Sequence, residues 1–220
     1  MKTNVANSER AVTLVDVCVV IALLALIVVA ILPGLHSRLP TPISRSQRIN
    51  CINNLRQNEL ALKTWAVDNN DKFPMQVSVT NGGTMEFVAD GLVYEHFQVM
   101  SNELSAPKLT LCPADVARQS ARSFSNGDFS NANVSYFLGV DASDTFPQMI
   151  LLGDRNITLE GSALKPGLIS LATNSPVGWT EEIHVEQGNI GLADGSVQQV
   201  SSTKLQQALQ WNGTNKWVVP

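Results

Sequence analysis

One apolar stretch near the N-terminus constrains this chain more than any other feature. Residues 17–32 carry no polar side chain except the thiol of Cys18. A helix over residues 12–35 rises about 36 Å at 1.5 Å per residue, which is enough to cross a hydrocarbon layer of about 30 Å. Soluble domains rarely contain a helix that is apolar on every side, so the sequence predicts a membrane-spanning helix over residues 12–35.

Asp16 lies near the start of this stretch. An acid at bilayer depth costs about 2.5–3.5 kcal/mol on insertion scales and is usually retained for a partner. Within its own helix, the carboxylate meets the positive end of the helix dipole. If the chain were cut before the apolar stretch, the new amine of one copy would be able to pair with Asp16 of the next copy. Such pairing would fix the axial register between staggered helices.

The polar leader at residues 1–11, the sequence VTLVD at 12–16, the apolar stretch and Pro33 follow one another in this order. This arrangement resembles the N-terminal signal of type IV pilins and type II secretion pseudopilins. The resemblance implies that a prepilin peptidase cuts between Ala11 and Val12 and methylates the new N-terminus. It also implies that Asp16 serves filament assembly and that Pro33 bends the helix.

Two other interpretations of the same stretch stay open. In the first, residues 12–35 form a simple single-pass anchor, and Asp16 sits at the level of the lipid headgroups. In the second, the stretch is an ordinary secretory signal, whose apolar core usually has about 7–15 residues and is followed by a cleavage site of small residues. The stretch is longer than such a core and ends at Pro33 and Gly34 without a clear site.

Composition and charge indicate one globular domain after the apolar stretch. The chain has 220 residues, a net charge of −4 and a charged fraction of 15%. Mild acidity without a basic cluster argues against nucleic-acid binding. We divide the chain into a leader (1–11), a transmembrane helix (12–35), a joint with Pro40 and Pro42 (36–43) and an extracytoplasmic globular domain (44–220).

Cysteine usage leaves two alternatives for the globular domain. Cys18 lies in the apolar stretch and is expected to be a small apolar side chain. Cys51 and Cys112 lie further along the chain and either form a disulfide or remain two buried thiols. A bridge across about 60 residues would stabilise the fold by several kcal/mol. No Cys-x-x-Cys spacing indicates zinc or redox chemistry.

Further motifs extend the resemblance over most of the chain, to a subgroup of pilin-like proteins with large heads. They are residues 51–57 (CINNLRQ), 97–108 (FQVMSNELSAPK), 112–115 (CPAD), 135–139 (SYFLG) and 153–156 (GDRN). His184 is followed after nine residues by Asp194 and Gly195, a spacing typical of this subgroup. The resemblance implies an α+β, pilin-like fold in which the N-terminal helix packs on an antiparallel sheet.

Hydrophobic periodicity predicts the elements of the globular domain. A helix from about residue 44 to 67 places Ile49, Ile52, Leu55, Leu62 and Trp65 on one face. We expect a strand hairpin around residues 81–83, a short helix over 94–104 and a second helix over 204–211. Further strands are expected at 134–140, 148–152, 169–172, 182–185, 190–193, 197–200 and, at a sheet edge, 216–219. Residues 187–189 are expected to form a hairpin turn between two of these strands.

Candidate sites for chemistry are few. His184, Asp194 and Ser196 are residue types used in hydrolysis, but no Gly-x-Ser-x-Gly elbow surrounds Ser196. We expect His184 to pack opposite Gly191 and Asp194 to be a turn residue, so the chain is not expected to be an enzyme. The metal content is undetermined: no cofactor is expected, although Asp141, Asp144, Asp154 and Asp194 are possible calcium donors without EF-hand spacing.

The resemblance implies a structural subunit of a type IV pilus-like or type II secretion pseudopilus filament, anchored in the membrane before assembly. Its expected partners are identical or related pilin subunits, the prepilin peptidase, an inner-membrane assembly platform and the membrane itself. Its expected location is the inner membrane, as a single-pass protein with the C-terminal domain in the periplasm or at the cell surface. The alternative is a monomeric, membrane-tethered extracytoplasmic binding module. The proline break at Pro40 and Pro42 and the presence of Ala11 before the cut favour that alternative.

Overall fold

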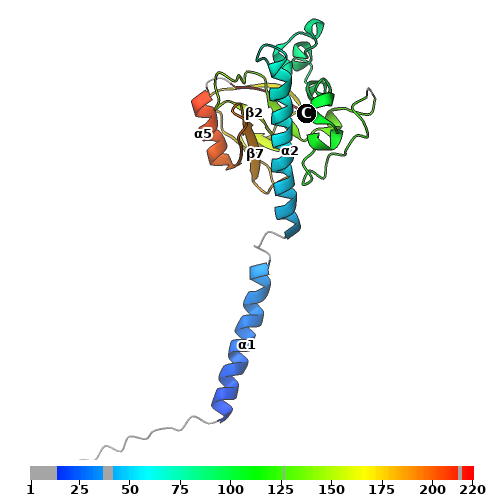
Figure 1. The fold of residues 1–220 in the computed structure, drawn as a ribbon. Helices are drawn as coiled ribbons and strands as arrows, with labels where there is room; N and C mark the ends of the chain where they lie inside the picture. The colour runs from blue at the N-terminus through cyan, green and yellow to red at the C-terminus, as the bar shows by residue number, and fades with distance from the viewer. Residues whose placement is uncertain (1–13, 37–41, 126, 213–214) are drawn as a thin grey trace, which may run out of the picture. The chain divides into compact units, whose positions relative to one another are not determined.

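The computed structural model describes residues 14–36, 42–125, 127–212 and 215–220. The chain divides into two compact units, Met1–Pro42 and Ile43–Pro220 (Figure 1). The first contains helix α1 (Leu14–His36), and the second contains helix α2 (Pro42–Val67) from Ile43 onward together with all the strands. Helices and antiparallel sheets make this an α+β structure.

Helix α1 does not meet the requirements for a membrane span. Among the described residues, no helix combines the length and the apolarity that a bilayer crossing demands. The apolar residues between Asp16 and Pro33 extend about 24 Å at 1.5 Å per residue, whereas a hydrocarbon core is about 30 Å thick. This finding contradicts the predicted transmembrane helix over residues 12–35. The predicted fold class, which included a transmembrane helix packed on the sheet, is therefore wrong in that part. The predicted location as a single-pass inner-membrane protein is wrong as well.

Helix α2 forms where the sequence predicts a helix, and it ends before the turn formers at residues 68–72. Of the side chains predicted for its buried stripe, Leu55, Leu62 and Trp65 are buried and Ile52 is half-buried. Cys51 is buried as well. Ile49, which was expected on the same face, is instead 53% exposed. The stripe also contains Asn58 and Glu59, two polar side chains that are buried.

The segment from residue 74 to 133 contains short helical turns. The predicted hairpin around residues 81–83 is wrong, because the flanking residues form 3-10 turns and the carboxylate of Glu86 accepts hydrogen bonds from Ser78 and Val79. The expected helix over 94–104 is two helices. The turns and helices are η1 (Pro74–Gln76), η2 (Val79–Asn81), η3 (Met85–Val88), α3 (Val93–Gln98), α4 (Ser101–Leu104), η4 (Pro107–Thr110) and η5 (Asn131–Asn133).

The main sheet has six strands in the order β5-β9-β1-β2-β7-β8, and a smaller sheet has the order β4-β3-β6. All of their pairings are antiparallel. The strands are β1 (Tyr136–Gly139), β2 (Ile150–Asp154), β3 (Ile157–Leu159), β4 (Ser162–Ala163), β5 (Gly167–Leu171), β6 (Val177–Trp179), β7 (Gln187–Leu192), β8 (Val197–Ser201) and β9 (Asn215–Val219).

Three predictions about the sheet need correction. Residues 182–185 form a turn, and residues 187–189 belong to β7 instead of a hairpin loop. The turn expected at Asp194 is confirmed, because the hairpin that joins β7 to β8 turns around Asp194 and Gly195. Strand β9 was expected at an edge but lies between β5 and β1, because Trp217, Val218 and Val219 are all buried and both sides of the strand find partners.

Hydrophobic cores cover both faces of the main sheet. On one face, Leu55 and Leu62 of α2 belong to the same cluster as Tyr136 and Leu138 of β1. On the other face, helix α5 (Ser202–Asn212) contributes residues to a second cluster. That cluster contains Phe137, Ile150, Ile190, Leu192, Val200, Leu205, Leu209, Trp217 and Val219. The sheet is therefore the middle layer of the globular unit.

Candidate functional site

Strand β7 presents different chemistry to its two sides. Ile190 and Leu192 belong to the core on the α5 side. Since neighbouring side chains of a strand point to opposite faces, Asn189 and Gly191 face the α2 side. These positions are polar or lack a side chain, and they allow polar groups to be buried between α2 and the sheet.

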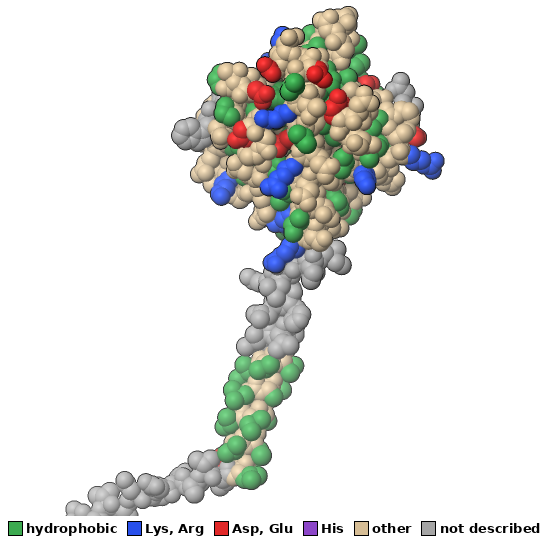
Figure 2. All heavy atoms as spheres, viewed as in Figure 1, with side chains coloured by type: hydrophobic (Ala, Val, Ile, Leu, Met, Phe, Trp, Pro, Cys, Tyr) green, Lys and Arg blue, Asp and Glu red, His purple; other side chains and the backbone are tan. Residues whose placement is uncertain are grey.

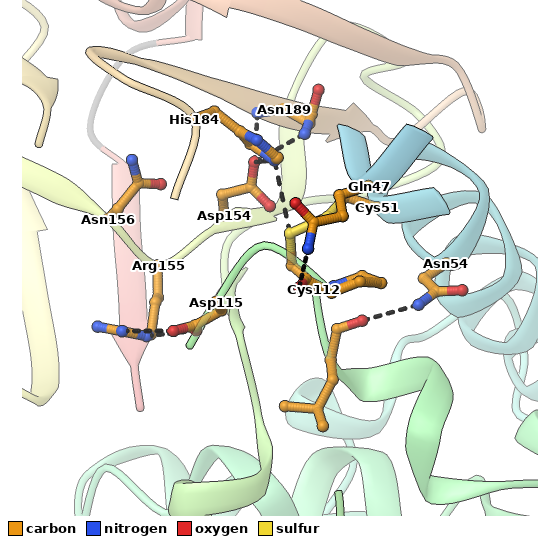
Figure 3. Close-up of a disulfide and its surroundings, with 12 residues drawn as sticks. Gln47, Cys51, Asn54, Cys112, Asp115, Asp154, Arg155, Asn156, His184 and Asn189 are labelled. Carbon is orange, nitrogen blue, oxygen red and sulfur yellow. Dashed lines mark hydrogen bonds and ion pairs between the residues drawn. A yellow bond between two sulfur atoms is a disulfide. The ribbon is translucent and has the colours of Figure 1, made fainter. Parts of the chain in front are cut away.

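A buried polar cluster forms at one end of β7, next to the disulfide between Cys51 and Cys112 (Figure 3). The Nε2 atom of His184 lies 3.5 Å from the sulfur of Cys112 and 3.4 Å from Oδ2 of Asp154. That same Oδ2 accepts hydrogen bonds from the backbone N–H and the side-chain amide of Asn189, at 2.7 and 2.8 Å. Its other oxygen, Oδ1, is buried without a hydrogen-bond partner.

Burial controls the charges in this cluster. It raises the pKa of Asp154 from 3.8 to about 7, and the two hydrogen bonds from Asn189 oppose this rise. Burial, together with the positive charge of Arg48, lowers the pKa of His184 to about 4. His184 is therefore neutral near pH 7, and its contact with Asp154 is a contact between a neutral ring and a carboxyl group, not an ion pair.

Arg48 of α2 holds the turn that carries His184. Its guanidinium donates to the backbone carbonyl of His184 at 2.9 Å and to the side-chain oxygen of Gln187 at 3.0 Å. Val185 and Glu186 in this turn have φ angles of 53° and 56°. Residues with a side chain adopt such angles at a cost of about 1–3 kcal/mol, so the surrounding contacts fix a strained turn.

An ion pair fixes the chain immediately after Asp154. Arg155 donates to both oxygens of Asp115, with distances of 2.7 Å from Nε and 2.8 Å from Nη2. Asp115 lies three residues after Cys112, in the segment that the disulfide joins to α2. Because such a two-point contact constrains direction as well as distance, it orients the end of β2 toward the disulfide.

Glu59 forms a separate buried acidic position further along α2. Its side chain is 1% exposed, and neither carboxyl oxygen has a hydrogen-bond partner. A Cβ atom on Gly191 would overlap its Oε1 atom, so the missing side chain of Gly191 makes room for Glu59. Burial and the nearby charge of Asp194 raise the pKa of Glu59 to about 8, against the opposing charges of Lys63 and Arg56.

The stability of the fold is expected to fall as the pH rises, because of Glu59. The folded chain keeps a proton on Glu59 up to about pH 8, whereas the unfolded chain releases it near pH 4.5. This contribution is fully present below pH 4.5 and is lost as the pH rises through 8. At pH 9, Glu59→Gln is expected to be more stable than the natural chain by about 1–3 kcal/mol, since it removes an unpaired buried charge.

Urea unfolding at pH 5, 7 and 9 measures this difference, with the exposed Glu181→Gln as the matched control. Equal pH profiles for the natural chain and Glu59→Gln would contradict the assignment to Glu59.

The site residues predicted from the sequence fall in different places. Ala11 and Val12 lie outside the described residues, Asp16 is exposed on α1, and Pro33 lies within α1. Cys51 and Cys112 are joined in a disulfide, with 4.7 Å between their Cα atoms.

The motif residues His184 and Asp194 flank opposite ends of β7. In the turn after this strand, Oδ1 of Asp194 accepts the backbone N–H of Ser196 at 2.8 Å, and Gly195 has a φ of 90°. His184 was expected opposite Gly191, but Gly191 pairs with Val197. The carboxyl group of Glu59 occupies the space that a side chain at position 191 would fill. A strand of six residues extends about 20 Å, so His184, Asp194 and Ser196 do not form one site.

The acids proposed as calcium donors have other contacts. Asp141 accepts the backbone N–H of Lys216 at 3.2 Å, and Asp144 pairs with Lys63 at 3.6 Å. In the described parts of the chain, these acids do not assemble a group of three metal-ligating side chains. The group that does converge is Cys51, Cys112 and His184, whose ligand atoms lie within 4.8 Å of one another.

Three residues that form or support the buried polar groups were not identified from the sequence, namely Arg48, Glu59 and Asp115. The burial of Glu59 could have been predicted from the sequence, because Glu59 lies four residues after Leu55 and three before Leu62, on the apolar stripe of α2. Arg48 and Asp115 act on segments far away along the chain and leave no local pattern. Comparison of the chain with protein-family models, with curated proteins and with solved structures finds no match.

Proposed function

We propose that this chain is the structural subunit of a pilin-like filament, in which helices α1 of neighbouring copies pack side by side. The observation that carries the proposal is the surface of α1. The large apolar side chains at positions 14–29 are all about half exposed or more, from 48% at Val17 to 81% at Leu14. Figure 2 shows hydrophobic side chains over the coloured part of this helix, on the face in view.

The apolar surface of α1 surrounds the helix. Successive residues of an α-helix point about 100° apart, so the four consecutive apolar residues 26–29 point to all sides. One neighbouring surface covers only one side of a helix. A helix that is apolar all round therefore needs several neighbours, and a bundle of α1 helices from other copies supplies them.

The globular unit is stabilised by its own internal contacts, as a filament subunit requires. Its disulfide, its two hydrophobic cores and the ion pair of Asp115 with Arg155 hold it together independently of α1. In this role the chain catalyses no reaction, and it is the substrate of a prepilin peptidase that cuts between Ala11 and Val12. The resemblance to pilins supports this part of the proposal.

Assembly of the purified full chain is expected to depend on α1. When a nonionic detergent is diluted away, the natural chain should form filaments of uniform width in electron micrographs. Ile27→Glu places a charge in the apolar surface and is expected to abolish filaments, because a buried unpaired carboxylate costs several kcal/mol. Val67→Glu, at a residue of α2 that is 74% exposed, is the matched control and should assemble normally.

Two results would count against the filament role. One is a natural chain that stays a single particle or forms only shapeless aggregates, and the other is Ile27→Glu forming the same filaments. Thermal unfolding of the globular unit, equal in all three chains, shows that the substitution acts on assembly alone.

The carboxylate of Asp16 is proposed to pair with the freed amine of Val12 in a neighbouring copy. A charge-assisted contact of this kind is strongest where water is excluded. Asp16→Asn should therefore be processed, as mass spectrometry of the N-terminus reports, yet fail to form filaments. Asp16→Glu keeps the charge and should assemble. Filaments of Asp16→Asn, or a chain that still begins at Met1, would remove this role.

A further inference from the structure

We propose that the disulfide cluster is also a zinc site: once Cys51 and Cys112 are reduced, their sulfurs bind one Zn²⁺ together with His184 and Asp154. This inference is independent of filament assembly. It concerns only the globular unit and the groups drawn in Figure 3.

The first argument is the donor set. The sulfurs of Cys51 and Cys112 and a ring nitrogen of His184 all lie within 4.8 Å of one another. Oδ2 of Asp154 lies 3.4 Å from that nitrogen. Two sulfurs, one imidazole nitrogen and one carboxylate oxygen make four ligands of the types that Zn²⁺ takes in tetrahedral sites.

The second argument is burial. Cys51 and Asp154 are 0% exposed, Cys112 is 1% and His184 is 2% exposed. Structural zinc sites are closed to solvent in the same way, with four protein ligands and no open position. Because all four donor side chains are buried, the site fits a structural ion better than a catalytic one.

The third argument is an unsatisfied group aimed at the same point. Oδ1 of Asp154 is buried without a hydrogen-bond partner. Figure 3 shows this oxygen, the one without dashed lines, pointing toward the disulfide. A buried carboxyl oxygen without a partner is costly, and a metal ion between it and the sulfurs would remove that cost.

The surrounding residues already hold the ligands in place. Asn189 donates two hydrogen bonds to Asp154, and Arg48 holds the backbone of His184. Such outer contacts orient metal ligands and commonly change metal affinity by about 10–100-fold. The ligands come from α2, the segment after η4, strand β2 and the turn before β7, so an ion would join the same elements that the disulfide joins.

Conversion of the disulfide into a zinc site takes two steps, reduction and metal binding. A dithiol reductant gives two electrons and two protons to the disulfide and is itself oxidised to a disulfide, which leaves two thiols. Zinc binding then replaces the two thiol protons, which pass to solvent. With ligands at about 2.3 Å, a tetrahedral ion keeps its sulfurs about 3.8 Å apart, a separation that side-chain rotation supplies once the S–S bond is broken.

Cobalt substitution tests the site in the full chain. The protein is unfolded in denaturant, reduced with a phosphine, which binds zinc less than a dithiol does, and refolded without oxygen in nonionic detergent. Titration with Co²⁺ should give one equivalent of tetrahedral cobalt with thiolate charge-transfer absorption, and Zn²⁺ should displace it. The oxidised chain should show neither the absorption of tetrahedral cobalt nor the thiolate charge-transfer absorption.

Variants identify the ligands. Asp154→Asn and His184→Gln are each expected to weaken Co²⁺ binding by at least about tenfold. Glu186→Gln, an exposed acid two residues after His184, is the matched control and should bind like the natural chain. Circular dichroism of each oxidised variant establishes that it folds.

Any one of three results would overturn the proposal: no tetrahedral cobalt in the reduced natural chain, equal binding by the oxidised chain, or natural affinity in both Asp154→Asn and His184→Gln. Equal binding by the oxidised chain would mean that the metal binds elsewhere, because the two sulfurs of that chain are joined in a disulfide bond.

Discussion

Replacing Cys51 and Cys112 together by alanine is expected to lower the free energy of unfolding by about 4 kcal/mol. The disulfide closes a loop with a sequence separation of 61 residues. In the chain-entropy account, a crosslink over a loop of this length stabilises by about that amount, because it restricts the unfolded chain. Both cysteines are also buried, so the variant loses packing at the centre of the polar cluster.

Urea unfolding of the oxidised protein, in the presence of a chelator, measures this loss. Cys18→Ala is the matched control, because Cys18 is an exposed free thiol on α1 and its removal should leave the globular unit unchanged. A loss below about 1 kcal/mol for the double variant would mean that the other contacts of residues 107–113 hold this segment to α2 without the crosslink. Those contacts include the hydrogen bonds from Asn54 and Asn58 to the carbonyls of Leu111 and Leu109.

The second large effect is expected from Gly191→Ala, with a loss of about 3 kcal/mol. The added methyl group overlaps the carboxyl group of Glu59 and comes within 2.9 Å of Leu152. Overpacking of a closed core costs about 1–3 kcal/mol, and here the displaced group is a buried carboxyl whose oxygens have no hydrogen-bond partner.

A double-mutant cycle separates this overlap from a general intolerance of alanine in β7. Glu59→Ala empties the space, so Gly191→Ala should cost much less in that background, with a coupling of at least about 1 kcal/mol. Unfolding free energies of the four chains at pH 6 give the coupling. Additive losses, within about 0.5 kcal/mol, would show that Gly191 is needed for the strand backbone and not for Glu59.

Elements whose pattern is local were predictable from the sequence. Helix α2 has an apolar stripe and a cluster of turn formers at its end, and the strand segments near β1, β2 and β5 are apolar runs between turn residues. Helix α5 was predicted within two residues at its start and one at its end. In these segments the local preference and the tertiary environment agree.

Residues 187–189 show why other elements were mispredicted. Gly188 suggested a turn, but its missing side chain serves close packing against the ring of Trp179 within a strand. The sequence does not distinguish a glycine needed for a turn from one needed for a neighbour. The same ambiguity affected Gly191, whose neighbour is Glu59 and not His184.

The candidate site was only partly predictable. His184 was identified from its spacing to Asp194, and Cys51 and Cys112 from their residue type, but nothing local joins these residues to Asp154. The cluster exists because β2 and β7 pair, α2 covers the sheet, and residues 180–186 turn back toward the disulfide. Each of these is a long-range contact that depends on the whole fold.

The position of β9 within the main sheet governs the order of events as the chain is synthesised. Strand β1 pairs with β2 on one side, but its other neighbour, β9, emerges about 76 residues later, and β5 also pairs with β9. Contacts between such distant residues form slowly because a long loop must close first. On the ribosome, the edges of β1 and β5 that pair with β9 therefore stay unpaired until residues 215–219 have left the exit tunnel. A nascent chain that is arrested before this point exposes these edges to chaperones.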